Sequence, residues 1–175
     1  LSTMSAALLL VASAAQAADM TTTPATPAAN PLTQPWTGPY GGVPPWDQVK
    51  VEFLKPALEA GMADQLAAID RIANDPATPT FANTIAALER SSRMLDRVYT
   101  VAGVYQSTMS DEAVQAVERD MAPKLAAFSD QITQNEKLFA RIAAVYATRE
   151  NSGLTPEQQR LTWLYYTDFV RQGAK

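Results

Sequence analysis

The feature that most constrains the fold is a long stretch of helical periodicity between Thr80 and Met109. Apolar side chains recur there at alternating intervals of four and three, which places them on one stripe of an α-helix. The stripe consists of Phe81, Ile85, Leu88, Leu95, Tyr99, Ala102 and Met109. Pro79 stops any helix that arrives from upstream, and Thr80 is a suitable N-cap. We therefore predict one continuous helix over residues 80–109, as the central helix of an all-α, antiparallel helical bundle.

The segment before it predicts another helix, from about Phe53 to Ala73. Pro56 lies near its beginning, and proline is tolerated only in the first turn because it has no backbone N–H. We therefore expect this helix to begin near residues 54–55. Gly61, in its interior, weakens it by about 1 kcal/mol relative to alanine.

Two more helices are predicted after residue 109. Ser110 is expected to cap the first of them, which continues to about Ile132 and contains Pro123. An internal proline removes one hydrogen bond and clashes with the preceding turn, so we expect a kink there. Asn135 is expected to cap the next helix, and one continuous helix through Asn135 is the alternative.

The last helix is predicted from about Pro156 to Gln172. Thr155 supplies an N-cap and proline occupies the first helical position, which is a typical start. Apolar residues surround this helix almost completely, and such a helix is normally buried. A domain of about five helices offers little to bury its end helix, so we expect an exposed apolar patch at Trp163, Tyr166 and Val170.

The first 17 residues have the character of a secretory signal peptide. They carry no charge, contain the apolar run MSAALLLVASAA, and end on the A-x-A cleavage pattern Ala15-Gln16-Ala17. The run is too short to span a membrane, which takes about 20 apolar residues. We expect export to the periplasm or secretion, with a mature start at Ala18 and no stable membrane span; a buried apolar helix is the alternative.

The composition divides the rest of the chain into three parts. Residues 18–34 are rich in proline and threonine and predict a disordered linker. Residues 35–48 contain three aromatic residues among glycines and prolines, and predict an extended arm whose rings fill pockets on another surface. Residues 49–175 form the helical lobe, which we expect to be truncated at its C-terminus.

The composition also excludes several kinds of site. The chain contains neither histidine nor cysteine, which are the main ligands of zinc sites and the partners of the common nucleophilic sites. It has no phosphate-binding loop of the G-x-x-x-x-G-K-[ST] type and no calcium loop. The net charge of −4, without a basic cluster, argues against nucleic acid as a partner. No catalytic, cofactor-binding or metal-binding residue is therefore predicted in this chain.

Four stretches of the sequence nevertheless resemble a known family. They are NPLTQPWTGPYGGVPPWDQV, the run from FLKPALEAGM to YQSTMS, MAPKLAAFSDQITQNEKLFARIAAVY and LTPEQQRLTWLYYTDFVRQGAK, which cover about Asn30 to Lys175. Together they resemble the start of the thimet-oligopeptidase family of zinc metallopeptidases, most of all its peptidyl-dipeptidase (dipeptidyl carboxypeptidase) and oligopeptidase A branch.

This resemblance implies a large, two-lobed, mostly helical enzyme whose deep cleft admits short peptides. In the family, zinc is held by two histidines of an H-E-x-x-H helix and a downstream glutamate, and the motif's glutamate activates the zinc-bound water. The resemblance implies that this chain is the N-terminal lobe of a larger two-lobed helical peptidase, and that its partners are the remaining catalytic part of the same polypeptide and short peptide substrates. Because the motif's histidines are absent, we expect this chain alone to bind no zinc and to be inactive.

Two other functions remain open. An exported, non-catalytic helical module that binds a protein or peptide is the main alternative, and a coiled-coil-like structural protein is the second. A freestanding module would need the apolar side of its last helix covered within the chain, whereas a separated lobe would leave it exposed. The sequence does not decide between internal cleavage of peptides and release of dipeptides.

Overall fold

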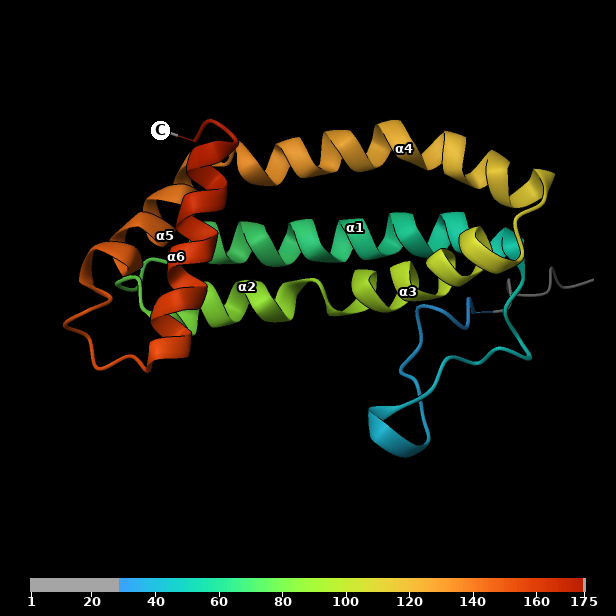
Figure 1. The fold of residues 1–175 in the computed structure, drawn as a ribbon, viewed down its shortest axis with the longest axis horizontal. Coiled ribbons are helices and arrows are strands. Elements are labelled where there is room, and N and C mark those ends of the chain that lie inside the picture. The colour runs from blue at the N-terminus through green and yellow to red at the C-terminus, as the bar shows by residue number, and fades with distance from the viewer. Residues whose placement is uncertain (1–28, 175) are drawn as a thin grey trace, which may run out of the picture.

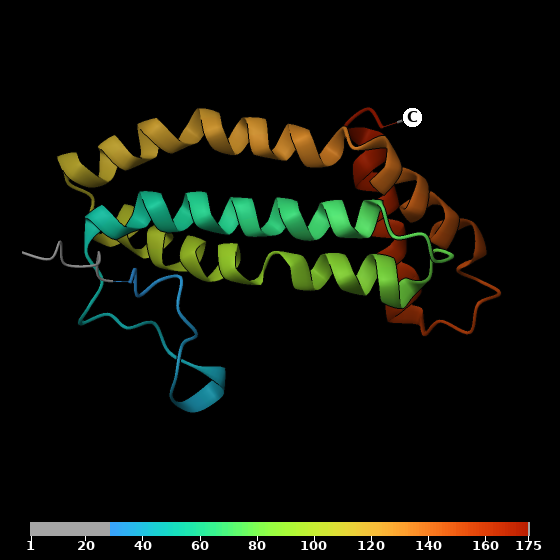
Figure 2. The same cartoon turned by 180° about the vertical axis from the view of Figure 1, so that it is seen from behind.

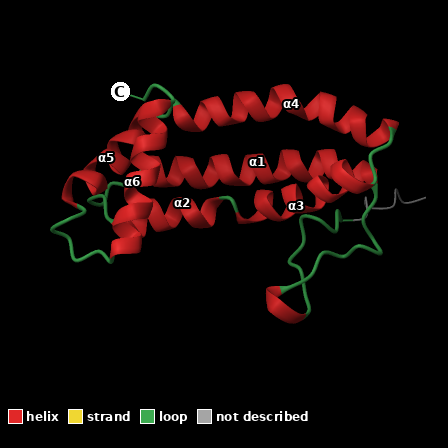
Figure 3. Cartoon of the chain, in the orientation of Figure 1, coloured by secondary structure: helices red, strands yellow, loops and turns green. Residues whose placement is uncertain are grey.

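The computed structural model describes residues 29–174, which form an all-α helical bundle without a strand (Figure 3). Six α-helices occupy this range: α1 (Val51–Ala73), α2 (Ala86–Ser91), α3 (Arg93–Thr108), α4 (Glu112–Thr133), α5 (Glu136–Thr148) and α6 (Pro156–Arg171). Two single-turn elements accompany them, a 3₁₀ turn η1 (Pro39–Gly41) and a π-helical turn η2 (Phe81–Ile85). The predicted all-α bundle is confirmed.

Helix α1 is the centre of the bundle. It packs against α2, α3, α4 and α5 and lies between α4 and the α2–α3 pair (Figure 1). Gly61 is among its buried residues, and its lack of a side chain permits a close approach of α3 at Leu95. The prediction that residues 80–109 form the central helix is therefore wrong, because α1 buries residues on more than one side.

The helix predicted over residues 80–109 is also divided. It begins with the π-helical turn η2, whose N-cap is Thr80 as predicted, and it is interrupted at Ser92 between α2 and α3 (Figure 2). The Ser91 hydroxyl donates to the carbonyl of Leu88 at 2.7 Å, and the Ser92 hydroxyl donates to the Asp96 carboxylate at 2.6 Å. Serine side chains that bond locally compete with the helical hydrogen bonds, and here they accompany the break.

The side chains form two hydrophobic cores. The first lies among α1, α3, α4 and the segment before α1, and it includes Leu32, Leu54, Leu58, Leu95, Val98, Val101, Tyr105, Val114 and Met121. The second lies at the other end, among α1, η2, α2, α5 and α6, and it includes Ile69, Ile72, Ile85, Leu88, Leu138, Ile142, Val145 and Phe169. Helix α6 crosses this second end and packs against α5 and η2 (Figures 1 and 2).

The segment before α1 contributes directly to the first core. Leu32, which falls within the predicted linker, is 0% exposed, and the Asn30 side chain donates to the carbonyl of Phe53 at 2.9 Å. Residues 29–34 thus pack against α1 in the structure and are not a free linker. The predicted signal peptide, residues 1–17, and residues 18–28 lie outside the described residues.

The predicted aromatic arm is attached through one of its three rings. Trp36 packs against the first core and carries the Arg97 guanidinium over its ring at 5.3 Å from the centroid. Trp46 is exposed, and Tyr40, the middle residue of η1, is fully exposed with a left-handed backbone (φ 59°). Gly42, also at positive φ, is required because a Cβ there would lie 2.6 Å from the Trp36 carbonyl oxygen.

Helix N-caps agree with the sequence at three of the four predicted positions and differ at one. Thr80, Asn135 and Thr155 are N-caps, so a continuous helix through Asn135 is excluded. Helix α4 is capped by Asp111 and not by Ser110, since the Asp111 carboxylate accepts from the Val114 N–H at 2.9 Å.

Prolines disturb these helices less than predicted. Helix α1 begins at Val51, about one turn before the predicted start, and Pro56 lies inside it. Helix α4 continues through Pro123 and is drawn as a gentle arc without a sharp kink (Figure 2). Both prolines cost a hydrogen bond that packing against neighbouring helices offsets.

None of the described helices is both long and apolar enough to cross a membrane.

Candidate functional site

Metal-ligating side chains are not gathered into a site in the described part of the chain. Residues 29–174 contain no group of three or more histidine, cysteine, aspartate or glutamate side chains close enough to bind one ion. The chain also lacks histidine and cysteine altogether, which are the usual ligands of zinc. The residues present therefore do not fit the zinc of the family that the sequence resembles.

The most distinctive surface in the described part of the chain lies on α6. Trp163, Leu164 and Val170 are 39%, 44% and 44% exposed, and Thr167 and Arg171 lie on the same side of the helix. Positions i, i+1, i+4, i+7 and i+8 share one side of an α-helix, so these five residues form a single stripe. We call this stripe the α6 face.

The opposite side of α6 is packed inside the bundle. Phe169 is buried in the second core, and the Tyr166 ring stacks on Phe139 and on Tyr146, with centroid separations of 5.8 and 4.0 Å. The predicted exposed patch is thus confirmed at Trp163 and Val170 and is wrong at Tyr166. Tyr166 is covered because the aromatic residues of α5 provide a stacking surface for it.

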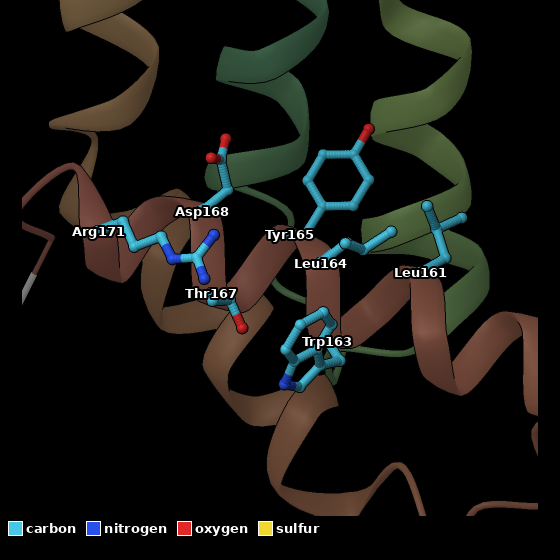
Figure 4. Close-up of a pocket in the computed structure, with 7 residues that line it drawn as sticks. All are labelled: Leu161, Trp163, Leu164, Tyr165, Thr167, Asp168 and Arg171. Atoms are coloured by element: carbon cyan, nitrogen blue, oxygen red, sulfur yellow. The ribbon is translucent and has the colours of Figure 1, made fainter.

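A hollow of about 250 Å³ lies beside the α6 face. Every residue that lines it belongs to α6: Leu161, Trp163, Leu164, Tyr165, Thr167, Asp168 and Arg171 (Figure 4). Its lining is mainly apolar, and a hollow with walls from a single helix is open on its remaining sides. The α6 face and this hollow are continuous through Trp163, Leu164, Thr167 and Arg171.

Tyr165 anchors this side of α6 to α2. Its hydroxyl donates a hydrogen bond of 2.6 Å to Oε1 of Glu89, and its ring points toward α2 (Figure 4). Burial, and then the hydrogen bond to the Glu89 carboxylate, raise the pKa of Tyr165 above its usual value. The hydroxyl therefore stays protonated at neutral pH and continues to donate.

Arg141 of α5 is a polar residue that the sequence analysis did not single out. It is 6% exposed, and its guanidinium donates to the carbonyl oxygens of Asp75 and Ala77 at 2.6 and 3.0 Å. A further contact of 3.5 Å reaches the Asp75 carboxylate, so Arg141 holds the loop after α1 against α5. The available signal was its position between Leu138 and Ile142, on the buried side of the helix.

Sequence comparison identifies the class of protein to which this all-α module belongs. No family model matches the chain. The chain is 35% identical over 146 residues to a dipeptidyl carboxypeptidase of Salmonella typhimurium, and 36% identical over 146 residues to one of Escherichia coli. Each match covers 83% of this chain and 21% of the relative.

The chain belongs to the peptidyl-dipeptidase/thimet oligopeptidase family, and it spans about a fifth of the length of the two curated relatives that it matches. The family named from the four sequence stretches is thereby confirmed, and a relationship to peptide-hydrolysing enzymes is established.

Proposed function

We propose that this chain is the N-terminal helical lobe of an exported zinc metallopeptidase that hydrolyses short peptides. The observation that carries the proposal is the similarity to two dipeptidyl carboxypeptidases over 83% of the chain. A match over 146 residues is long enough to include helices of both cores.

The catalytic centre is proposed to lie in the part of the longer polypeptide outside this chain. This follows from the donor chemistry of the residues present: zinc peptidases of this family use histidine ligands, and this chain has none. The role of the lobe is then to form part of the wall that restricts the cleft to short peptides. The lobe itself supplies neither zinc ligands nor the general base.

Export is proposed from the signal-like residues 1–17, whose apolar run and A-x-A pattern precede the described helices. The mature enzyme would then act on peptides in the periplasm or outside the cell.

The experiment begins with the coding DNA beyond codon 175. We expect an open frame that encodes an H-E-x-x-H helix, and we expect the product of that longer frame to release dipeptides from the C-termini of short peptides. A chelator should abolish the release and added zinc should restore it. Replacement of the motif's glutamate by glutamine is the control, because it removes the general base while it leaves the ligands in place.

The 175-residue chain, given zinc and the same peptides, should show no chelator-sensitive hydrolysis. Turnover by this chain would contradict the proposal. A long frame without a metal motif would instead favour the second candidate, a non-catalytic module that binds protein or peptide. The exposed apolar side chains of the α6 face favour that second candidate, because a binding module needs such a surface.

A further inference from the structure

We propose that the α6 face is a docking surface for an amphipathic helix that belongs to the part of the family polypeptide outside this chain. The inference rests on the proposed function, since it takes the lobe to be one part of a longer enzyme. It adds which surface of the lobe makes the contact, and which kind of element it receives.

The spacing of the α6 face is that of a helix-packing ridge. Trp163, Thr167 and Val170 follow one another at intervals of four and three, as do the side chains with which one helix packs into the grooves of another. Thr167, between the two larger residues, is small enough to let a partner backbone approach closely. A partner helix that runs along α6 would therefore meet large side chains at the ends of the contact and a shallow centre.

The hollow gives that helix a place for an apolar side chain. Its walls come from α6 alone, and its volume of about 250 Å³ exceeds that of any single side chain. A knob from the partner helix would enter next to Leu161 and Leu164, and the partner's neighbouring residues would supply the missing walls. The filled hollow would then be a fully desolvated apolar centre, as protein interfaces typically have.

The rim of the surface indicates the charge of the partner. Arg171 makes no ion pair with any residue in the range 29–174, whereas Asp168, one turn away in the sequence, accepts a hydrogen bond from the Gln172 amide at 2.9 Å. A carboxylate on the partner helix opposite Arg171 would complete the rim. Such a contact at the edge mainly orients the partner and adds little affinity.

The occupant is inferred from the length of the relatives. About four fifths of each dipeptidyl carboxypeptidase lie outside the match, so an enzyme of this family has ample further protein to cover the face. Exposed apolar area beside a hollow, on an otherwise well-packed bundle, is typical of a surface that another element covers. A second copy of this chain is the competing occupant, and the test separates the two.

The test compares the 175-residue chain alone with a chimera in which it replaces the matched fifth of the Escherichia coli dipeptidyl carboxypeptidase. Leu164→Glu places a charge in the face, and Leu164→Met keeps its apolar character. Met109→Glu is the control, at an exposed apolar position just after the end of α3. Thermal unfolding of each protein is followed by circular dichroism, and the oligomeric state of the chain alone by sedimentation.

We expect Leu164→Glu to leave the Tm of the chain alone nearly unchanged, because Leu164 is exposed there, and to lower the Tm of the chimera by at least about 5 °C. Leu164→Met and Met109→Glu should leave both values in place. An unchanged chimera, or equal losses in the chimera and the chain alone, would overturn the proposal. So would a dimer of the chain alone that Leu164→Glu dissociates, since the occupant would then be a second copy.

Dipeptide release by the chimera is measured separately. An active chimera whose Tm is insensitive to Leu164→Glu would refute the docking surface and keep the proposed function. An inactive chimera whose Tm falls with Leu164→Glu would support the docking surface and count against the proposed function.

Discussion

The hydroxyl of Tyr165 donates a hydrogen bond of 2.6 Å to the carboxylate of Glu89, across 76 residues of sequence. This contact joins α6 to α2 at the edge of the hollow, while Phe169 fixes the same helix in the second core. Helix α6 is therefore held on one side by apolar packing and on another by a charge-assisted hydrogen bond. On the remaining side of α6, the α6 face, Trp163 and Leu164 stay exposed.

Tyr165→Phe tests the contribution of this hydrogen bond. Because its pKa is raised in the folded state, Tyr165 keeps its proton at pH values where an unfolded tyrosine, with a pKa of 10.0, has lost it. The free energy of unfolding therefore falls as the pH rises above about 10, and the phenylalanine variant should lack this part of the fall. At neutral pH we expect a loss of about 1 kcal/mol.

Urea unfolding of the parent chain and of Tyr165→Phe between pH 7 and 11 measures how the difference in their free energies of unfolding changes with pH. Glu89→Gln is the matched variant, since it keeps an oxygen acceptor and removes the charge that helps to raise the pKa of Tyr165. Identical alkaline profiles for the parent chain and Tyr165→Phe would contradict the prediction.

Gly61→Ala should destabilise the bundle, against the usual preference of helices for alanine. A Cβ at Gly61 would lie 3.0 Å from Cα of Leu95 and 3.1 Å from its Cδ1, so α1 and α3 would have to separate by a few tenths of an ångström. Overpacking of this kind costs about 1–3 kcal/mol, which exceeds the gain in helix propensity of about 1 kcal/mol.

Gly103→Ala is the matched control on α3, because a Cβ at Gly103 would have no atom within 4 Å. This substitution should stabilise the protein by about 0.5–1 kcal/mol. Chemical denaturation of the two variants measures both changes in the free energy of unfolding. A stabilising Gly61→Ala would show that the contact between α1 and α3 is looser than the structure indicates.

The sequence predicted the helical elements well because their signals are local. Thr80, Asn135 and Thr155 are caps whose side chains bond to the backbone within a few residues, and such bonds depend little on the rest of the fold. The identity of the central helix depended on distant contacts. Gly61 was read as a weakness of its helix, whereas the structure uses its lack of a side chain to bring Leu95 close.

The candidate surface was partly predictable for the same reason. Exposure of Trp163 and Val170 followed from a helix that is apolar on nearly all sides, since the bundle cannot cover all of them. The burial of Tyr166 depends on stacking with Phe139 and Tyr146, and that of Arg141 on the carbonyl groups of a loop that begins 66 residues earlier. Periodicity within one helix carries no information about such pairings.

Lys55→Met should raise the pKa of Asp120 toward its ordinary value. In the structure the Lys55 ammonium bonds the Asp120 carboxylate at 2.6 Å, and this hydrogen bond and charge hold the pKa of Asp120 below its usual 3.8. The contact between α1 and α4 therefore contributes fully to stability above the ordinary pKa of 3.8, and this contribution is lost as the pH falls through the lowered pKa of Asp120.

Carboxyl chemical shifts of Asp120, followed by NMR between pH 2 and 6, measure the change. Lys124→Met is the matched control, because Lys124 pairs with Glu59 and its charge has a smaller influence on Asp120. Both side chains of the Lys55–Asp120 pair are exposed, so 1 M salt should shrink the difference. An Asp120 midpoint that Lys55→Met leaves in place would refute the contact.

Leu32→Ala should destabilise the bundle by about 3 kcal/mol, although Leu32 lies in a stretch whose composition predicts a linker. Its side chain is 0% exposed in the first core, with Leu54 and Val101 among its companions, and truncation there leaves a cavity. Asn30 holds the same segment through its bond to the Phe53 carbonyl, so the segment has little freedom to close that cavity.

The matched control is Tyr40→Ala, at a fully exposed position of the neighbouring arm, which should change stability by less than about 0.5 kcal/mol. Urea denaturation of the two variants compares them directly. Equal, small effects would mean that residues 29–34 behave as the free linker that their composition suggests, and that the first core is complete without Leu32.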